Sequence, residues 1–313
     1  QGYFLTSFAA FPSFIFSFIA SGAHAYLTEG KQKRQIKGAF AQYLAPDMVD
    51  ALIADPDKLT LGGEKRKMTI MFCDVRGFTA ISEALKDRPE VLAEVINTLL
   101  TELTNDILDS GGTIDKYMGD CIMAFWNAPL EVDNHQIISC QAALNMHKAM
   151  LELNTLRKEE AEEAGKEFLE LKIGIGLNTG DCVVGNMGSD QRFDYSVLGD
   201  AVNLASRLEG QSKSYGVKTV IGEETNLNIE NVYATLKLDL IAVKGKKEAV
   251  AIYTLLGDNE MKTSGGFENL FQHHNQMLEY YFKQDWDAAL NKINICRNLL
   301  NGIMSEYYDI MIT

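Results

Sequence analysis

Cysteine is scarce in this chain, and its few cysteines are widely spaced. The 313 residues contain five cysteines, none of them in a C-x-x-C pair. A disulfide framework or a cysteine-based zinc site needs closely grouped cysteines. The sequence therefore supports neither and is typical of a reducing compartment.

Basic residues are also in deficit. Lysine and arginine total 29 against 43 aspartates and glutamates, which gives a formal net charge of −14. Because affinity for a phosphate backbone depends on clustered lysine and arginine, this balance argues against a nucleic-acid partner. Hydrophobic residues make up 46% of the chain and charged residues 23%, so a packed core can form, and the length predicts about two domains.

Charge is missing altogether from residues 1–28, which contain no Asp, Glu, Lys or Arg. A helix over residues 3–27 would be about 37 Å long, enough to cross a hydrocarbon core of about 30 Å. The basic residues that follow predict a cytoplasmic location for the rest of the chain by the positive-inside bias. They are Lys31, Lys33, Arg34 and Lys37. We therefore expect a transmembrane helix at 1–28, with a signal peptide or a buried core helix as alternatives.

The first residue is glutamine rather than methionine, so we expect a fragment of a longer protein. Residues 29–63 have helical spacing and predict a helical linker that could transmit a signal. At the other end, residues 257–313 predict a helical tail with two short helices around Asp285. Such a pair resembles one tetratricopeptide-type unit, which needs a partner surface; a helical cap on the preceding domain is the alternative.

Between these flanks, residues 64–256 alternate short apolar strands with long amphipathic helices in the order β-α-β-β-α-β. This order predicts an α+β catalytic domain, ferredoxin-like or palm-type, with a sheet covered by helices. The expected elements are a strand at 68–73, a helix at 88–109, a hairpin of strands at 113–117 and 121–126, a helix at 135–164, a second hairpin of strands at 171–177 and 182–187, a helix at 199–214, and further strands with a short helix at 217–256.

Two aspartates stand at the ends of predicted strands. Asp74 follows the strand at 68–73, and Asp120 lies in the turn of the first hairpin. Each alone would be ordinary, Asp74 as a helix N-cap and Asp120 as a turn residue. On neighbouring strands, however, the two carboxylates would repel each other unless divalent cations such as Mg²⁺ lie between them. Two such cations are a common device for in-line displacement at phosphorus.

The loop at 75–79 offers a place for a phosphate. It opens a helix, so its backbone N–H groups would point at a phosphate bound beside the metals. The residues concerned are Gly77, Phe78 and Thr79. The chain has no G-x-x-x-x-G-K-[ST] motif, which excludes a Walker A site.

Asn203 and Arg207 form a second candidate set. They are four residues apart and share one face of the predicted helix at 199–214. Asparagine can orient a ribose oxygen, and the arginine fork can stabilise charge on a transferring phosphoryl group. An amphipathic helix with two solvated polar residues is the alternative.

Three ordered motifs resemble the catalytic domain of the class III nucleotide cyclases. They lie at 64–79 (EKRKMTIMFCDVRGFT), 115–129 (DKYMGDCIMAFWNAP) and 193–208 (FDYSVLGDAVNLASRL). The resemblance covers residues 64–256 and implies a head-to-tail homodimer with ATP sites at the subunit interface. The segment at 36–60 is also similar to the linker of bacterial membrane cyclases with a CHASE2-type sensor. That similarity implies a bacterial inner-membrane location, a cytoplasmic catalytic domain and control by an upstream sensor.

The resemblance implies roles for five residues in metal binding and catalysis. Asp74 and Asp120, with the backbone of Val75, would bind two divalent cations, Mg²⁺ or Mn²⁺. Asn203 would hold the ribose and Arg207 would stabilise the transition state. The implied reaction is attack of the ribose 3′-oxygen of ATP on its α-phosphorus, which gives 3′,5′-cyclic AMP and pyrophosphate.

Three further residues would bind the substrate. Lys244 matches the lysine that binds the terminal phosphates, and Lys116 matches the purine-selecting lysine of adenylate cyclases. Adenine offers an acceptor at N1 and a donor at N6, whereas guanine reverses this polarity, so Lys116 favours ATP. Ser196 stands where the family carries Asp or Thr; its hydroxyl can still accept from N6, but the smaller contact implies looser selection against GTP.

Two alternatives stay open. One is a guanylate cyclase or a cyclase of relaxed specificity. The other is a catalytically silent module that senses nucleotides, although every matched position is filled. Diguanylate cyclases have a related palm-like layer of sheet and helices, but this sequence has no GGDEF-like turn.

Overall fold

The computed structural model describes residues 63–163, 165, 168–189, 192–242 and 249–312, together with Ser17, Ser21 and Val49. The predicted transmembrane helix at 1–28 and the predicted linker at 29–63 therefore lie almost entirely outside the described residues, as does Lys244. Of the helices within those ranges, none is both long and apolar enough to cross a membrane. The chain divides into two compact units, 1–59 and 60–313, and the elements below belong to the second.

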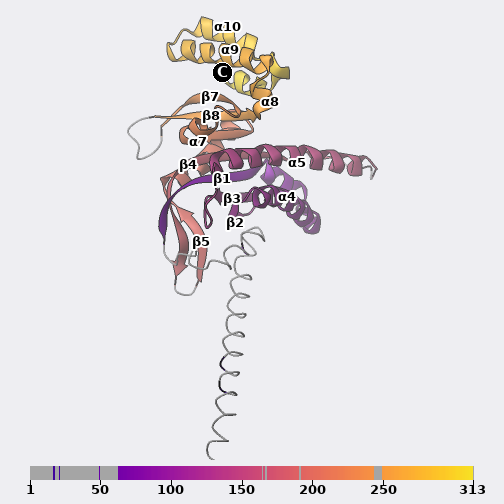
Figure 1. Cartoon of the computed structure of the whole chain (residues 1–313). Coiled ribbons are helices and arrows are strands. Elements are labelled where there is room, and N and C mark those ends of the chain that lie inside the picture. The colour runs from indigo at the N-terminus through magenta and orange to yellow at the C-terminus, as the bar shows by residue number, and fades with distance from the viewer. Residues whose placement is uncertain are drawn as a thin grey trace, which may run out of the picture. The chain divides into compact units, whose positions relative to one another are not determined.

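The first half of this unit has the predicted β-α-β-β-α-β order (Figure 1). Strands β1, β2, β3 and β4 form the sheet order β2-β3-β1-β4, with β1 antiparallel to both of its neighbours. This is the ferredoxin-like arrangement, so the α+β fold class is confirmed. The elements are β1 (Glu64–Arg76), α3 (Phe78–Ala84), α4 (Pro89–Asp109), β2 (Thr113–Met118), β3 (Cys121–Trp126), α5 (His135–Glu163) and β4 (Lys172–Ser189).

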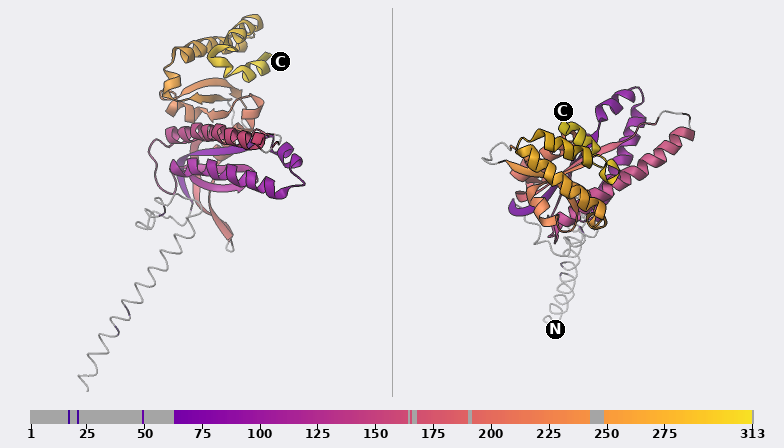
Figure 2. Two further views of the ribbon diagram at one scale, coloured as in Figure 1. Left: turned by 90° about the vertical axis from the view of Figure 1, so that its right-hand side faces the viewer. Right: turned by 90° about the horizontal axis from the view of Figure 1, so that it is seen from above.

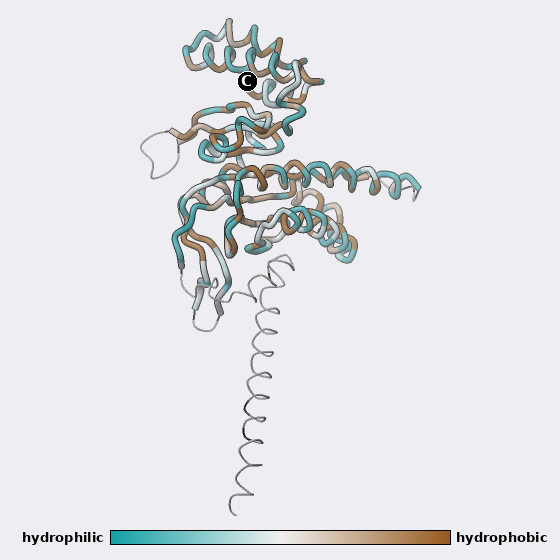
Figure 3. Tube along the Cα trace, viewed as in Figure 1, coloured by the Kyte–Doolittle hydropathy of each residue, from teal (hydrophilic) through white to brown (hydrophobic). Residues whose placement is uncertain are grey.

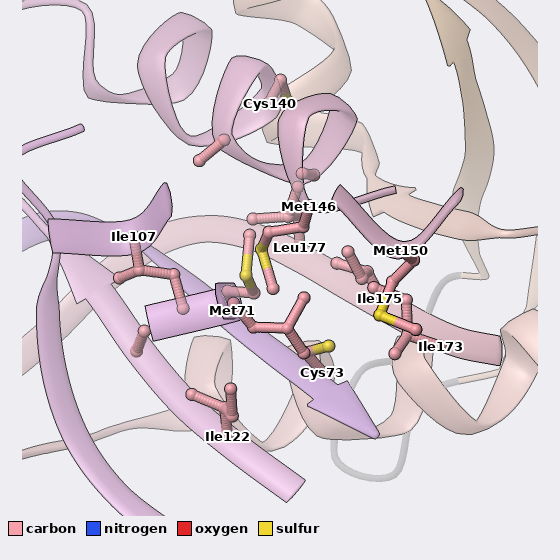
Figure 4. Packing of buried hydrophobic residues seen from close by; sticks show 14 of the residues in the cluster. Met71, Cys73, Ile107, Ile122, Cys140, Met146, Met150, Ile173, Ile175 and Leu177 are labelled. Atoms are coloured by element: carbon pink, nitrogen blue, oxygen red, sulfur yellow. The ribbon is translucent and has the colours of Figure 1, made fainter. Parts of the chain in front are cut away.

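Strand β1 is hydrophobic on both faces because both faces of the sheet are covered. Met71 and Cys73 point into the cluster beneath α4 and α5, where they meet Ile107 and Met146 (Figure 4). The alternate residues, such as Ile70, belong to a cluster on the opposite face that includes side chains of α6. Because successive strand residues face opposite ways, a continuous apolar run is what a doubly covered strand requires.

Helix α5 continues beyond this core. Its buried residues end at Asn154, and the remaining turns, coloured largely as hydrophilic in Figure 3, project past the sheet. The change from an apolar stripe to a polar surface explains why the sequence shows charged residues in the second half of this helix.

The second hairpin predicted at 171–187 is wrong. Residues 172–189 form one strand, β4, which pairs with all thirteen residues of β1 from Glu64 to Arg76. Gly180 and Asp181 stay in the ladder opposite Met68 and Lys67. The turn signal at 179–181 is therefore overridden by the backbone hydrogen bonds that the long partner strand offers.

Strand β4 turns instead into β5 (Arg192–Leu198), which was not predicted and which pairs with the outer end of β4. Helix α6 (Asp200–Ser214) follows and packs against β4 and β1. The sheet then continues beyond β4 with β6, β8 and β7, as expected for 217–256. The remaining elements here are β6 (Thr219–Gly222), α7 (Glu223–Ile229), β7 (Ala234–Ile241) and β8 (Val250–Gly257).

The tail packs on the β7 side of the sheet (Figure 2). Leu270 and Tyr307 of the tail share one buried cluster with Leu208 of α6 and Leu236 of β7. This packing agrees with the helical-cap interpretation of 257–313 rather than with a free tetratricopeptide-type unit. The tail consists of α8 (Asn259–Lys262), α9 (Gly265–Phe282), α10 (Trp286–Cys296), a 3₁₀ turn (Leu299–Gly302) and α11 (Ser305–Ile312).

Candidate active site

A pair of carboxylates lies where β1 ends beside the β2–β3 turn. The register pairs Cys73 with Ile122, which places Asp74 next to Asp120. Gly119 precedes Asp120 with a φ of 70°, a left-handed conformation that glycine adopts without strain and that lets the hairpin turn here. Burial, followed by the charge of the nearby Asp120 carboxylate, raises the pKa of Asp74. The structure therefore brings these two predicted residues together.

A third acid, Glu209, faces this pair from α6, and the sequence analysis missed it. Burial raises the pKa of Glu209 to about 7, and the charge of Asp74 adds to the effect. The thiol of Cys121 lies near the same carboxylates. Burial, and then the charge of Asp74, raises its pKa to about 12. Glu209 lies two residues after Arg207, and residues two apart on a helix point in different directions. The helix face that carries Arg207 therefore gave no reason to include Glu209.

This negative cluster fits a divalent cation. Two carboxylates in contact, partly out of water, are stabilised by a hard cation between them. Within the described ranges, no group of three or more His, Cys, Asp or Glu side chains, this one included, is arranged as a metal site. Mg²⁺ commonly takes only one or two carboxylates and completes its shell with water and substrate phosphates, so the pair matches that usage.

The loop after Asp74 begins a helix as expected. Gly77 has a φ of 71° and stands directly before α3. Ala80 and Ile81 donate their backbone N–H groups to the Gly77 carbonyl. The first N–H groups of the helix, before these two, are therefore those of Phe78 and Thr79. The first N–H groups of a helix have no partner within the helix.

The predicted purine residues meet at a buried carboxylate that the sequence analysis did not single out. Ser196 Oγ on β5 donates a hydrogen bond of 2.7 Å to Oδ2 of Asp115 on β2. Lys116 Nζ forms an ion pair of 3.1 Å with Oδ1 of the same carboxylate. The Asp115 side chain is fully buried, whereas that of Lys116 is 44% exposed. The structure thus joins Lys116 and Ser196 through Asp115.

A β-bulge makes this arrangement possible. The pairing of β2 with β3 shifts between Ile114 and Lys116, so Asp115 is an extra residue in its strand. Thr113, Ile114 and Asp115 are all buried, which a regular strand with one exposed face would not allow. Bulges re-aim side chains and are common beside functional sites.

Asn203 and Arg207 are exposed on α6. Glu209, which faces Asp74 and Asp120, lies two residues after Arg207. At about 100° per residue, Arg207 points about 160° away from the Glu209 side and Asn203 about 120° away. A single chain therefore does not bring Asn203 and Arg207 to the carboxylate pair.

Comparison with known proteins places the chain in a family. Residues 63–257 match the adenylate and guanylate cyclase catalytic domain. The chain belongs to this family. Among curated proteins, an adenylate cyclase of Anabaena cylindrica is 35% identical over 225 residues, which cover 71% of this chain and 42% of that protein. The chain thus spans less than half the length of this relative.

Solved structures of both substrate types are similar to this cyclase domain. The adenylyl cyclase CyaB from P. aeruginosa is 36% identical with a TM-score of 0.57, covering 63% of this chain and 97% of that one. The guanylyl cyclase Cya2 is 33% identical with a TM-score of 0.54, covering 65% and 98%. The matches confirm the predicted family, the class III nucleotide cyclases, and the two adenylate cyclases among them support the predicted enzyme.

Proposed function

We propose that this chain is the catalytic part of a membrane-anchored adenylate cyclase that converts ATP to 3′,5′-cyclic AMP and pyrophosphate. The observation that carries the proposal is the contact between the Asp74 and Asp120 carboxylates at adjoining strand ends. That contact is costly without a cation and suits a reaction at a phosphate ester with one. The likeness to CyaB and to the Anabaena enzyme supports the same reaction.

The active site is shared by two copies of the chain in a head-to-tail homodimer. Asn203 and Arg207 point away from the carboxylates of their own chain, so a second copy has to present them. Apolar side chains around the β2–β3 and β4–β5 hairpins are exposed and would be covered in a dimer. They are Tyr117, Met118, Val183 and Leu198.

Each residue has one task in the cyclisation. Asp74 and Asp120, with the Val75 backbone, would hold two divalent cations, Mg²⁺ or Mn²⁺, which when bound would make the 3′-hydroxyl more acidic and offset charge on the leaving pyrophosphate. The 3′-oxygen gives its proton to water and bonds to the α-phosphorus, while the bond from that phosphorus to the oxygen of the leaving pyrophosphate breaks. Asn203 orients the ribose, and Arg207 stabilises the charge that develops on the α-phosphoryl oxygens.

The remaining predicted residues bind the rest of the nucleotide. The N–H groups of Gly77, Phe78 and Thr79 and the ammonium of Lys244 bind phosphate oxygens. Lys116 and Ser196 contact the purine, with the lysine as donor to N1 of adenine. GTP is the second candidate substrate, because Cya2 is a guanylyl cyclase and a serine at 196 leaves a smaller contact than Thr or Asp.

The flanks add location and control. The uncharged segment 1–28 is the anchor in the bacterial inner membrane, with the catalytic domain on the cytoplasmic side. The linker at 29–63 passes a change in dimer geometry from an upstream sensor to the shared site.

Complementation between two inactive variants tests the proposal. Asp74→Ala and Arg207→Ala should each abolish conversion of ATP to cyclic AMP, because every site would lack one element. Mixed in equal amounts, they should recover about a quarter of wild-type activity, since half the dimers are mixed and each has one intact site of two. Product analysis with Mn²⁺ or Mg²⁺ measures both.

Asp74→Ala mixed with Asp120→Ala is the matched control. Both changes fall on the same half of the site, so every site in that mixture is damaged and no activity should return. Recovery in neither mixture would falsify the shared site, and a wild-type protein that produces no cyclic nucleotide would remove the proposed reaction itself.

A further inference from the structure

Asp115 is buried in contact with Lys116 and Ser196, the two residues proposed to bind the purine. Its side chain is fully buried, and Oδ1 has no partner with hydrogen-bond geometry within the described ranges. The Lys116 ammonium at 3.1 Å from Oδ1 supplies the compensating charge. A buried carboxylate is costly unless it is paired, so Asp115 depends on its two partners, Lys116 and Ser196, and holds both of them in turn.

The hydrogen bond from Ser196 fixes the direction in which its hydroxyl acts. A serine hydroxyl has one proton and two lone pairs, and a carboxylate can only accept. The Ser196 proton is committed to Oδ2 of Asp115 at 2.7 Å, and Ser196 itself is 7% exposed. Toward any other group, therefore, the Ser196 oxygen can act only as an acceptor.

We propose that Asp115 is a positioning residue that sets the purine preference of this site. By taking the Ser196 proton it makes that hydroxyl an acceptor for the 6-amino group of adenine, and by pairing with Lys116 it holds the donor for N1 beside it. Guanine presents a carbonyl oxygen at position 6, which would meet a lone pair of Ser196. The inference rests on the proposed cyclase function and adds a residue that acts through two others.

The Asp115→Asn variant tests the inference. The amide has the same shape but can donate its N–H to Ser196, which frees the hydroxyl proton and removes the fixed polarity. We expect the ratio of kcat/KM for ATP to that for GTP to fall by about tenfold or more, because a site that hydrogen-bonds a substrate group discriminates through that bond. If Asp115 had a purely structural role, Asp115→Asn would lower kcat/KM equally for ATP and for GTP. The ratio would then be unchanged, which would overturn the inference.

Two further variants make the comparison specific. In a Ser196→Ala background, Asp115→Asn should change the ratio by less than it does in the wild type, because only Lys116 remains of the two residues through which Asp115 acts. Asp309→Asn removes an exposed carboxylate from an ion pair with Arg297 in the tail and should leave the ratio as in the wild type. A full effect of Asp115→Asn without Ser196 would contradict the proposed route.

The wild-type protein gives a second test, which holds even if Asp115→Asn does not fold. Purine riboside triphosphate keeps the N1 acceptor of ATP but lacks the 6-amino donor. With Ser196 fixed as an acceptor, its kcat/KM should be about tenfold or more below that of ATP. Equal values would overturn the inference while cyclic AMP formation still upheld the proposed function. Absence of turnover with either nucleotide would instead refute the proposed function. The relative binding of ATP and GTP to the wild type and to Asp115→Asn would then test the role of Asp115 directly.

Discussion

At the scale of single residues, the site gathers negative charge that opposes folding. The pKa of Asp74 and that of Glu209 are both raised, first by burial and then by neighbouring carboxylates. A carboxyl whose pKa is raised in the folded state binds its proton more tightly there than in the unfolded chain. It therefore lowers stability as pH rises through that range. A bound cation would reverse this cost, so binding and stability are coupled.

Asp120→Asn should stabilise the metal-free protein and abolish its stabilisation by divalent cations. Removing one carboxylate relieves repulsion with Asp74, which for a half-exposed pair amounts to about 0.5–1 kcal/mol. The amide also lacks the charge that Mn²⁺ or Mg²⁺ needs. Thermal unfolding near neutral pH, with and without Mn²⁺, measures both effects. Asp133→Asn, at an exposed loop position, should keep the cation-dependent shift; a lower metal-free unfolding temperature for Asp120→Asn would contradict the account.

Which residues meet at the site was only partly predictable. Asp74 and Asp120 could be paired because each stands at the end of a recognisable strand. Asp115 could not, because its place depends on a bulge and on a hydrogen bond to a residue 81 positions away. Glu209 was hidden for the same kind of reason, since its neighbours come from β1 and the hairpin turn.

At the scale of elements, close packing of α6 on β4 positions two parts of the site. A Cβ atom on Gly176 of β4 would overlap the backbone N of Glu209 and the carbonyl oxygen of Ala205. Glycine is needed here for close approach rather than for a turn. The contact fixes how α6 is rotated, so Glu209 faces inward while Arg207 and Asn203 face out.

Gly176→Ala should push α6 off the sheet and lower both stability and activity. Overpacking against backbone atoms costs about 1–3 kcal/mol, and the displaced helix carries Asn203 and Arg207. Gly210→Ala on α6 is the matched control, because nothing lies within 4 Å of its Cβ position. This variant should leave the free energy of unfolding unchanged or raise it by about 0.5–1 kcal/mol. Urea unfolding and turnover of ATP measure the two variants. Equal stability of both would show that α6 does not depend on this contact.

The elements themselves followed the sequence where periodicity was long and local. The helices at α4, α5 and α6 and the β2–β3 hairpin match the expected ranges within a few residues. The continuous strand β4 did not, because Gly180 and Asp181 indicate a turn unless β1 is there to pair with them. β5 depends on the outer end of that same long strand.

At the scale of the whole molecule, a buried histidine ties the tail to the sheet. The Lys237 carbonyl can only accept, so His274 Nε2 donates to it at 2.6 Å. The neutral ring then accepts at Nδ1 from the Tyr308 hydroxyl at 2.8 Å. Tyr307 adds a hydrogen bond of 2.9 Å to the Leu238 carbonyl. Helices α9 and α11 are thus joined to β7 by polar contacts inside an apolar cluster.

Acidification should weaken the contact between the tail and β7. Burial lowers the pKa of His274 from 6.5 to about 4, so its neutral form stabilises the fold above about pH 6.5, and that stability is lost as pH falls toward about 4. The loss amounts to about 3 kcal/mol. Urea unfolding over this pH range should show a steeper decline for wild type than for His274→Gln. His273→Gln, at the adjacent and less buried position, should keep the wild-type slope; parallel slopes for wild type and His274→Gln would contradict the assignment.

The sequence by itself determined the α+β order of the elements and the family, and it predicted Asp74, Asp120, Lys116, Asn203 and Arg207 as site residues, because hydrophobic period and ordered motifs are local properties. The tertiary structure alone decided which groups share a contact: the Asp115 link between two strands, the inward face of α6 and the seat of the tail. Those outcomes depend on bulges, register and close packing between segments far apart in the chain. Such features are set by the competition for hydrogen bonds and space within the folded core, which no local pattern records.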